Sequence, residues 1–126
     1  YIPSKDEVHL PPKESFADSG EYYATVFHEL GHATGHESRL NRHGLETGIA
    51  PFGSATYSKE ELAAEFASAF LCAVSGIENT IDNSAAYIAG WARVLRQDKK
   101  IVVQAASQGQ KAADFILGAG EEAPDA

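Results

Sequence analysis

Two histidines stand four residues apart, with a glutamate beside the first, in the segment His28-Glu29-Leu30-Gly31-His32. On a helix, side chains four residues apart project from one face, so both imidazoles can reach one metal ion. Glu29 would then lie beside the ion, where its carboxylate can hold a water molecule and take its proton. The pattern therefore predicts a metal on His28 and His32, with Glu29 as catalytic acid and base.

A catalytic zinc ion usually takes three protein ligands and keeps one coordination position open, so a third ligand must come from elsewhere. The extended motif HExxHxxGxxH of the metzincins fails here, because Gly35 is in place but Ser38 stands where the last histidine should be. His36 and His43 lie nearby in the sequence and are weak candidates.

Glu61 and Glu65 are stronger candidates for the third ligand, since they share one face of a second expected helix. Two interpretations compete. In one, Glu61 binds the metal and Glu65 orients a ligand histidine. In the other, Glu65 binds the metal and Glu61 only caps its helix together with Ser58. The stretch ELAAE resembles the thermolysin-type pattern of the gluzincins, in which the ligand glutamate is followed four residues later by an acid. That favours Glu61.

Peptide hydrolysis often needs a further group that stabilises the oxyanion. Tyr87 is a possible oxyanion stabiliser, and Tyr57 and His43 are candidates by residue type alone. The segment Val8-His9-Leu10 is expected to be a short strand, which could pair with an extended substrate.

Helix signals predict the elements that must position these residues. Asp18 and Glu21 have the spacing of a helix start, and Gly35 is expected to end that helix. Alanines along the second helix would let it approach the HExxH helix closely. The expected helices run from about 19 to 35, from 59 to 75 after Ser58, from 84 to 97, and from 99 to 117 between Asp98 and Gly118.

Length and composition limit the class of protein. The chain has 126 residues, of which 44% are hydrophobic, as expected for one globular domain spanning 1–126. A net charge of −8 disfavours nucleic-acid binding by this domain alone, and no basic amphipathic face, signal peptide or transmembrane run is present. The single Cys72 fits a reducing compartment. The chain has no methionine and starts at Tyr1, so we expect a domain excised from a longer protein.

The combined motifs resemble the C-terminal metallopeptidase domain of ArdC-type antirestriction proteins. The resemblance rests on YYATVFHELGHATGHESRLNR, FGSATYSKEELAAEFASAFLCAVSGI, SAAYIAGWARVLRQDKK and QKAADFILG. It implies a cytoplasmic, zincin-like α+β domain, mainly helical with a small N-terminal β element. It also implies a divalent metal on His28 and His32, Glu29 as acid and base, and a carboxylate of EELAAE as third ligand. A single-strand-DNA-binding domain would precede this one and is missing here.

Two functions follow as hypotheses. The first is a zinc-dependent peptidase, with Mn²⁺ as another possible metal, acting on an unidentified protein or peptide. The second is a metal-stabilised, non-catalytic module that protects incoming DNA by binding a host restriction component or its own DNA-binding domain. An open coordination position beside Glu29 would favour catalysis, and one closed by His36 or Glu65 would favour a structural metal.

Overall fold

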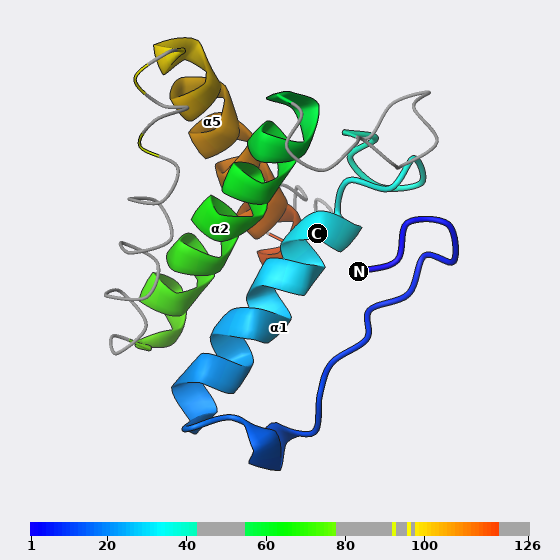
Figure 1. The fold of residues 1–126 in the computed structure, drawn as a ribbon, viewed down its shortest axis with the longest axis vertical. Coiled ribbons are helices and arrows are strands. Elements are labelled where there is room, and N and C mark those ends of the chain that lie inside the picture. Colours follow the sequence, from blue (N-terminus) through cyan, green and yellow to red (C-terminus); the bar gives the residue numbers. More distant parts are fainter. Residues whose placement is uncertain (43–54, 78–91, 93–95, 97, 119–126) are drawn as a thin grey trace, which may run out of the picture.

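The computed structural model describes residues 1–42, 55–77, 92, 96 and 98–118 (Figure 1). In these parts, three long helices follow a short 3-10 helix, η1 (Lys13–Ser15): α1 (Ser19–Ala33), α2 (Ala55–Ser75) and α5 (Lys99–Leu117). Helix α2 packs extensively against both α1 and α5, whereas α1 and α5 barely touch. Helix α2 is therefore the central element of the described fold.

The expected N-terminal β element is wrong. The described segments contain no strand, and residues 8–10 have no regular structure. A single antiparallel bridge joins Ile2 to Glu7 across a turn. Val8-His9-Leu10 is followed by Pro11 and Pro12, which have no backbone N–H to donate to a ladder. The segment therefore offers no edge of the kind to which we expected a substrate to pair.

Capping side chains start α1 and α5 where the sequence predicts. Asp18 accepts a hydrogen bond from the backbone N–H of Glu21 at 2.8 Å, and Asp98 accepts one from Lys100 at 3.0 Å. Both satisfy a backbone donor that a helix start leaves without an intrahelical partner. Helix α5 ends as expected at Gly118, whose φ of 69° is the left-handed conformation that glycine adopts without strain.

Two helix ends differ from expectation. Helix α1 ends at Ala33, two residues before Gly35, and Thr34 is its C-cap residue. Helix α2 begins at Ala55 rather than Lys59, so Ser58 lies inside the helix and cannot cap it. The interpretation in which Glu61 merely completes a cap with Ser58 is therefore wrong, and Glu61 is in the second turn of a continuous helix.

Small residues let the three helices approach closely. A Cβ added at Gly31 of α1 would lie 3.2 Å from the Cα of Ala64 in α2. A Cβ added at Gly109 of α5 would lie 2.6 Å from the Cβ of Phe66, also in α2. The expected close contact between α2 and the HExxH helix is confirmed. The buried core is correspondingly alanine-rich: Leu62, Ala63, Ala64, Ala67, Leu71, Cys72, Ala105, Ala112 and Ala113.

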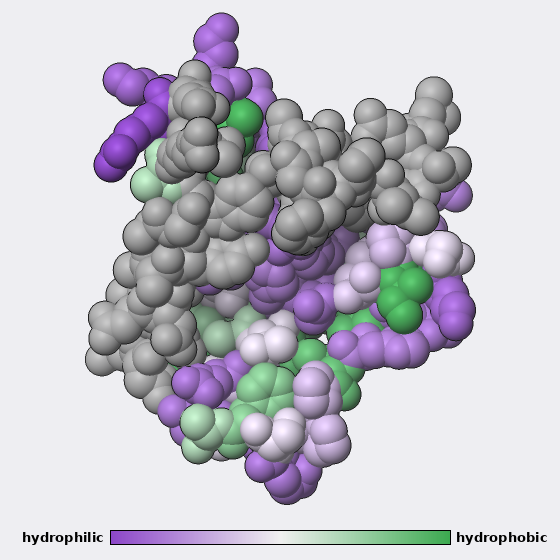
Figure 2. Space-filling view, in the orientation of Figure 1, coloured by the Kyte–Doolittle hydropathy of each residue, from purple (hydrophilic) through white to green (hydrophobic). Residues whose placement is uncertain are grey.

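The surface of the described segments mixes apolar and hydrophilic residues. On the face shown in Figure 2, hydrophilic residues gather over the junction of α1 and α2. None of the described helices is long and apolar enough to cross a bilayer. The expected third helix over 84–97, which contains Tyr87, lies almost entirely outside the described residues, as does the acidic tail.

Candidate metal centre

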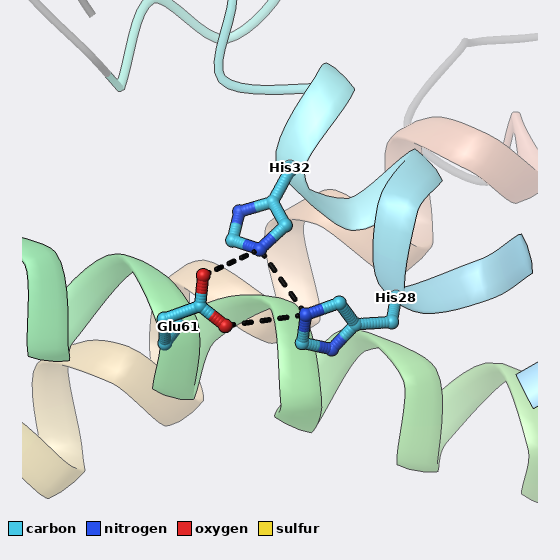
Figure 3. A group of neighbouring side chains, drawn as sticks. All are labelled: His28, His32 and Glu61. Atoms are coloured by element: carbon cyan, nitrogen blue, oxygen red, sulfur yellow. Dashed lines mark hydrogen bonds and ion pairs between the residues drawn. The ribbon is translucent and has the colours of Figure 1, made fainter. Parts of the chain in front are cut away.

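Three potential ligands converge between α1 and α2. His28 and His32 lie one turn apart on α1, and both point toward Glu61 of α2 (Figure 3). The Nε2 atoms of the two histidines are 3.1 Å apart. One oxygen of Glu61 lies 3.3 Å from Nε2 of His28, and the other lies 3.1 Å from Nε2 of His32. The side chains are mostly buried, at 18% exposure for His28 and 12% for His32.

These distances fit a metal ion. A tetrahedral ion with bonds of about 2.0–2.1 Å holds its ligand atoms about 3.3 Å apart. The two Nε2 atoms are 3.1 Å apart, close to that value, and each has a different oxygen of the Glu61 carboxylate at 3.1 or 3.3 Å. One ligand atom from each of the three side chains can be chosen so that all lie within 4.8 Å of one another. Two imidazole nitrogens and one carboxylate are also a ligand set that zinc accepts, and imidazole and carboxylate ligands suit other divalent metals as well.

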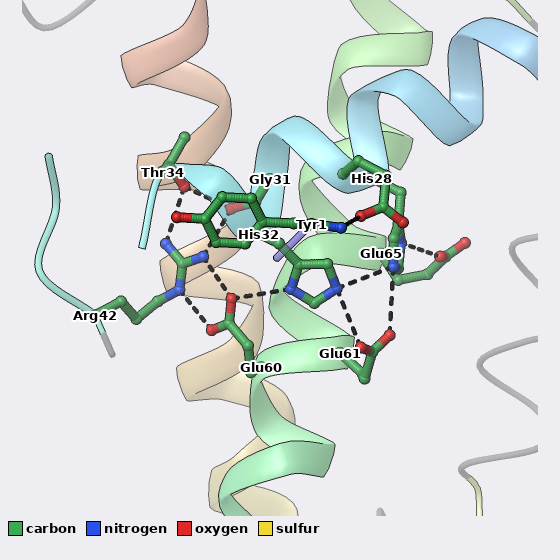
Figure 4. Close-up of polar contacts among 10 residues, drawn as sticks. Tyr1, His28, Gly31, His32, Thr34, Arg42, Glu60, Glu61 and Glu65 are labelled. Atoms are coloured by element: carbon green, nitrogen blue, oxygen red, sulfur yellow. Dashed lines mark hydrogen bonds and ion pairs between the residues drawn. The ribbon is translucent and has the colours of Figure 1, made fainter. Parts of the chain in front are cut away.

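The outer nitrogen of each histidine also faces a carboxylate. Nδ1 of His28 lies 3.1 Å from Glu65, and Nδ1 of His32 lies 3.2 Å from Glu60 (Figure 4). When each Nδ1–H donates to its carboxylate, Nε2 is left with a lone pair for a metal. Glu65 is thus placed to orient His28, while the Glu61 carboxylate faces the Nε2 atoms of both histidines. Of the two interpretations of the sequence, the geometry favours Glu61 as ligand.

Sequence reasoning missed a pair of residues next to this site. Arg42 donates two hydrogen bonds to the Glu60 carboxylate, at 2.8 and 2.7 Å. The same guanidinium donates to the carbonyl of Gly31 at 2.7 Å and to the hydroxyl of Thr34 at 3.0 Å. Arg42 lies ten residues beyond His32 in an irregular segment, so no helical spacing could connect it with Glu60.

Glu29 lies apart from the three converging ligands. It is on the adjacent face of α1, its side chain is 22% exposed, and its carboxylate pairs with the amino group of Tyr1. Among the described residues, the group that could hold a metal consists of His28, His32 and Glu61, so Glu29 is left for a role other than ligand. Its role as catalytic acid and base stays a prediction.

The histidines and carboxylates of this site shift one another's pKa values. Burial alone would lower the pKa of His28, but hydrogen bonds with Glu61 and Glu65 outweigh it and raise the pKa to about 9. Burial also lowers the pKa of His32, but hydrogen bonds with Glu60 and Glu61 outweigh this effect, so the pKa is raised overall. For Glu61, burial favours the neutral form, but the two histidines hold the carboxyl pKa well below its ordinary value. Protons and a metal therefore compete for the same nitrogens.

The remaining candidates are not at this site or cannot be placed. His36 is described, and its Nδ1 lies 2.8 Å from the hydroxyl of Ser38, away from the ligand group. His43, Tyr87 and the side chain of Tyr57 lie outside the described residues. The roles assigned to these three therefore stay predictions.

A crevice of about 390 Å³ lies on another side of α1. It separates the N-terminal segment from the last turns of α1 and α5, and Tyr1, whose amino group contacts Glu29, forms part of its wall. Its lining is mainly apolar, which suits the binding of an apolar side chain. The lining residues are Tyr1, Asp6, Val8, Leu30, Ala33, Thr34, Arg39, Phe115 and Ile116.

The sequence matches a known protein family over most of its length. Residues 1–108 match the model of the zincin-like metallopeptidase family, MPTase-PolyVal. The chain belongs to this family. Membership confirms the zincin-like, mainly helical fold that the resemblance implies.

Similar proteins are longer than this chain. DNA primase TraC of Escherichia coli is 45% identical over 117 residues, which are 93% of this chain and 11% of that protein. The metal-free crystal structure of the antirestriction protein ArdC from plasmid R388 is 42% identical, with a TM-score of 0.70 over 93% of this chain and 41% of that one. The Mn(II)-bound ArdC structure gives a TM-score of 0.71 over 94% and 43%. The resemblance to ArdC is confirmed, and the chain spans less than half of these relatives.

Proposed function

We propose that this chain is a metal-dependent peptidase domain that holds a divalent ion on His28, His32 and Glu61. The observation that carries the proposal is the convergence of one ligand atom from each of these three side chains within 4.8 Å of one another, while other carboxylates face the outer imidazole nitrogens. Zinc is the expected metal for this ligand set. The Mn(II)-bound structure of ArdC supports manganese as an alternative.

A bound metal would supply a Lewis acid that polarises a scissile carbonyl. The chain's own residues would do the rest. His28, His32 and Glu61 hold the site, Glu65 and Glu60 fix the two imidazole rings, and Glu29 takes the proton of an attacking water. Glu29 then passes that proton to the leaving amine. The apolar crevice beside α1 is where we place a side chain of the substrate.

The biological role we propose is antirestriction in the cytoplasm, and the support for it is the likeness to ArdC. That likeness also supports a second function. In it, the metal stabilises a non-catalytic module that protects incoming DNA through a host restriction component or an attached DNA-binding domain. The likeness to DNA primase TraC supports a domain that is joined to different partner domains.

Replacing the general base separates the two functions. Zinc-loaded parent protein and Glu29→Gln are incubated with a proteome-derived peptide library, and new termini are read by mass spectrometry. The peptidase proposal expects cleavage by the parent, loss of at least about 100-fold in Glu29→Gln with zinc retained, and parental cleavage by Glu37→Gln. Glu37 is an exposed carboxylate beyond the end of α1, so it controls for the loss of one charge. A zinc-loaded parent that cleaves nothing, or an active Glu29→Gln, would overturn the peptidase assignment.

A further inference from the structure

We propose that Arg42 is a positioning residue for the metal centre, acting on His32 through Glu60. The inference rests on the proposed metal site and names a part of it that lies outside the HExxH motif and the third ligand. The chain of contacts runs from the Arg42 guanidinium to the Glu60 carboxylate and from there to Nδ1 of His32 (Figure 4).

The Arg42–Glu60 contact is a two-point one. Nε donates to one carboxylate oxygen at 2.8 Å and Nη2 to the other at 2.7 Å. Two parallel hydrogen bonds between planar groups fix the orientation of the carboxylate as well as its position. The Arg42 side chain is only 7% exposed and that of Glu60 18%, so water competes little with this geometry. The carboxylate that faces His32 is therefore held in one orientation.

The same guanidinium also holds the backbone on which His32 stands. Nη2 donates to the carbonyl of Gly31, the residue directly before His32, and Nη1 donates to Thr34. The Gly31 carbonyl is in the last turn of α1, where carbonyls lack a regular intrahelical donor. Thr34 donates to this carbonyl as well, at 2.6 Å. Arg42 thus ties the end of α1 to α2 and constrains His32 from both its backbone and its ring.

Charge gives Arg42 a second role. Glu60, Glu61 and Glu65 all surround the histidine pair, and Glu60 is next to Glu61 in α2. Without a cation, the Glu60 carboxylate would be repelled by its neighbours in a mostly buried site. Arg42 offsets part of this repulsion and so helps to keep the Glu60 carboxylate beside His32 as an acceptor.

Variants at Arg42 test the inference through metal affinity and spectroscopy. Zinc affinity is measured by chelator competition on the parent, Arg42→Gln and Arg42→Lys, and the absorption spectrum of the Co²⁺-loaded protein reports ligand geometry. We expect Arg42→Gln to lose about 10- to 100-fold in zinc affinity and to change the cobalt spectrum. Arg42→Lys keeps the charge but not the two-point contact, so it should recover only part of the loss. Lys111→Gln is the control for the loss of one positive charge, because Lys111 is exposed on α5, which supplies none of the three potential ligands.

A double-mutant cycle distinguishes positioning from general loss of stability. Combining Arg42→Gln with Glu60→Gln should cost clearly less affinity than the product of the two single losses, because both changes break the path through Glu60. Combining Arg42→Gln with Glu65→Gln should multiply the two losses, since Glu65 serves His28. If both Arg42 variants bind zinc as the parent does, or if Lys111→Gln weakens binding equally, the inference is overturned. A parent that binds no zinc would overturn the metal site itself and the inference with it.

Discussion

At the scale of single residues, the two carboxylates Glu61 and Glu65 have different tasks although they share a helical face. Glu61 lies within 3.3 Å of both Nε2 atoms, and Glu65 faces the outer nitrogen of His28. Glu61→Gln should therefore abolish tight zinc binding, because it removes the anionic ligand. Glu65→Gln should cost about 10- to 100-fold, because it only loosens the orientation of His28. Chelator competition measures both, and the reverse order of effects would identify Glu65 as the ligand.

The raised histidine pKa values predict how zinc affinity depends on pH. In the metal-free chain the pKa of His28 is about 9, above its ordinary value near 6.5. The stability that protonated His28 gives the metal-free fold is thus complete below about pH 6.5 and is lost as pH rises through about 9. Zinc affinity should change in the opposite sense and increase from pH 7 to 9, by up to about tenfold per pH unit for each proton displaced.

The same competition titration, repeated across that pH range, checks this dependence. Glu65→Gln provides the internal comparison, because it removes one of the hydrogen bonds that raise the pKa of His28. In that variant the increase should be displaced to lower pH. A zinc affinity that is constant between pH 7 and 9 in the parent would contradict the account.

At the scale of helices, the site depends on how closely α1 approaches α2. Gly31 directly precedes His32, and a Cβ added at Gly31 would lie 3.2 Å from the Cα of Ala64 in α2. Gly31→Ala should force the two helices apart and weaken zinc binding by about tenfold, comparable to a lost supporting contact. Gly109→Ala, whose Cβ would lie 2.6 Å from Phe66 at the interface of α2 and α5, should destabilise the fold by about 1–3 kcal/mol.

The two glycine variants are informative as a pair. Gly109→Ala should lower the melting temperature while the folded protein binds zinc as the parent does, because α5 supplies no ligand. Gly31→Ala should lower affinity even at temperatures where the protein is fully folded. Equal zinc affinity in Gly31→Ala and the parent would show that the spacing of α1 and α2 does not control the site.

At the scale of the whole molecule, the sequence predicted those features that depend on residues close together in the chain, such as helix ends. Asp18, Asp98 and Gly118 mark helix ends through their own side chains or backbone, so their positions were readable. The HExxH spacing predicted a shared face for the same reason. The prediction of a strand over Val8–Leu10 was wrong, because a strand needs a partner strand and no local sequence signal shows whether one is present. The contact of Arg42 with Glu60 depends on the path of an irregular segment, and that path is set by tertiary structure.

The central claim is that His28 and His32 hold one divalent ion, and metal stoichiometry tests it most directly. Zinc is measured by elemental analysis after exhaustive dialysis of the parent, His28→Ala, His32→Ala and the control His36→Ala, with helix content checked by circular dichroism. His36 is the matched control because its ring bonds to Ser38 and not to the ligand group. The account predicts one zinc per chain in the parent and in His36→Ala, and far less than one in the other two variants. One zinc per chain in folded His28→Ala or His32→Ala would contradict it.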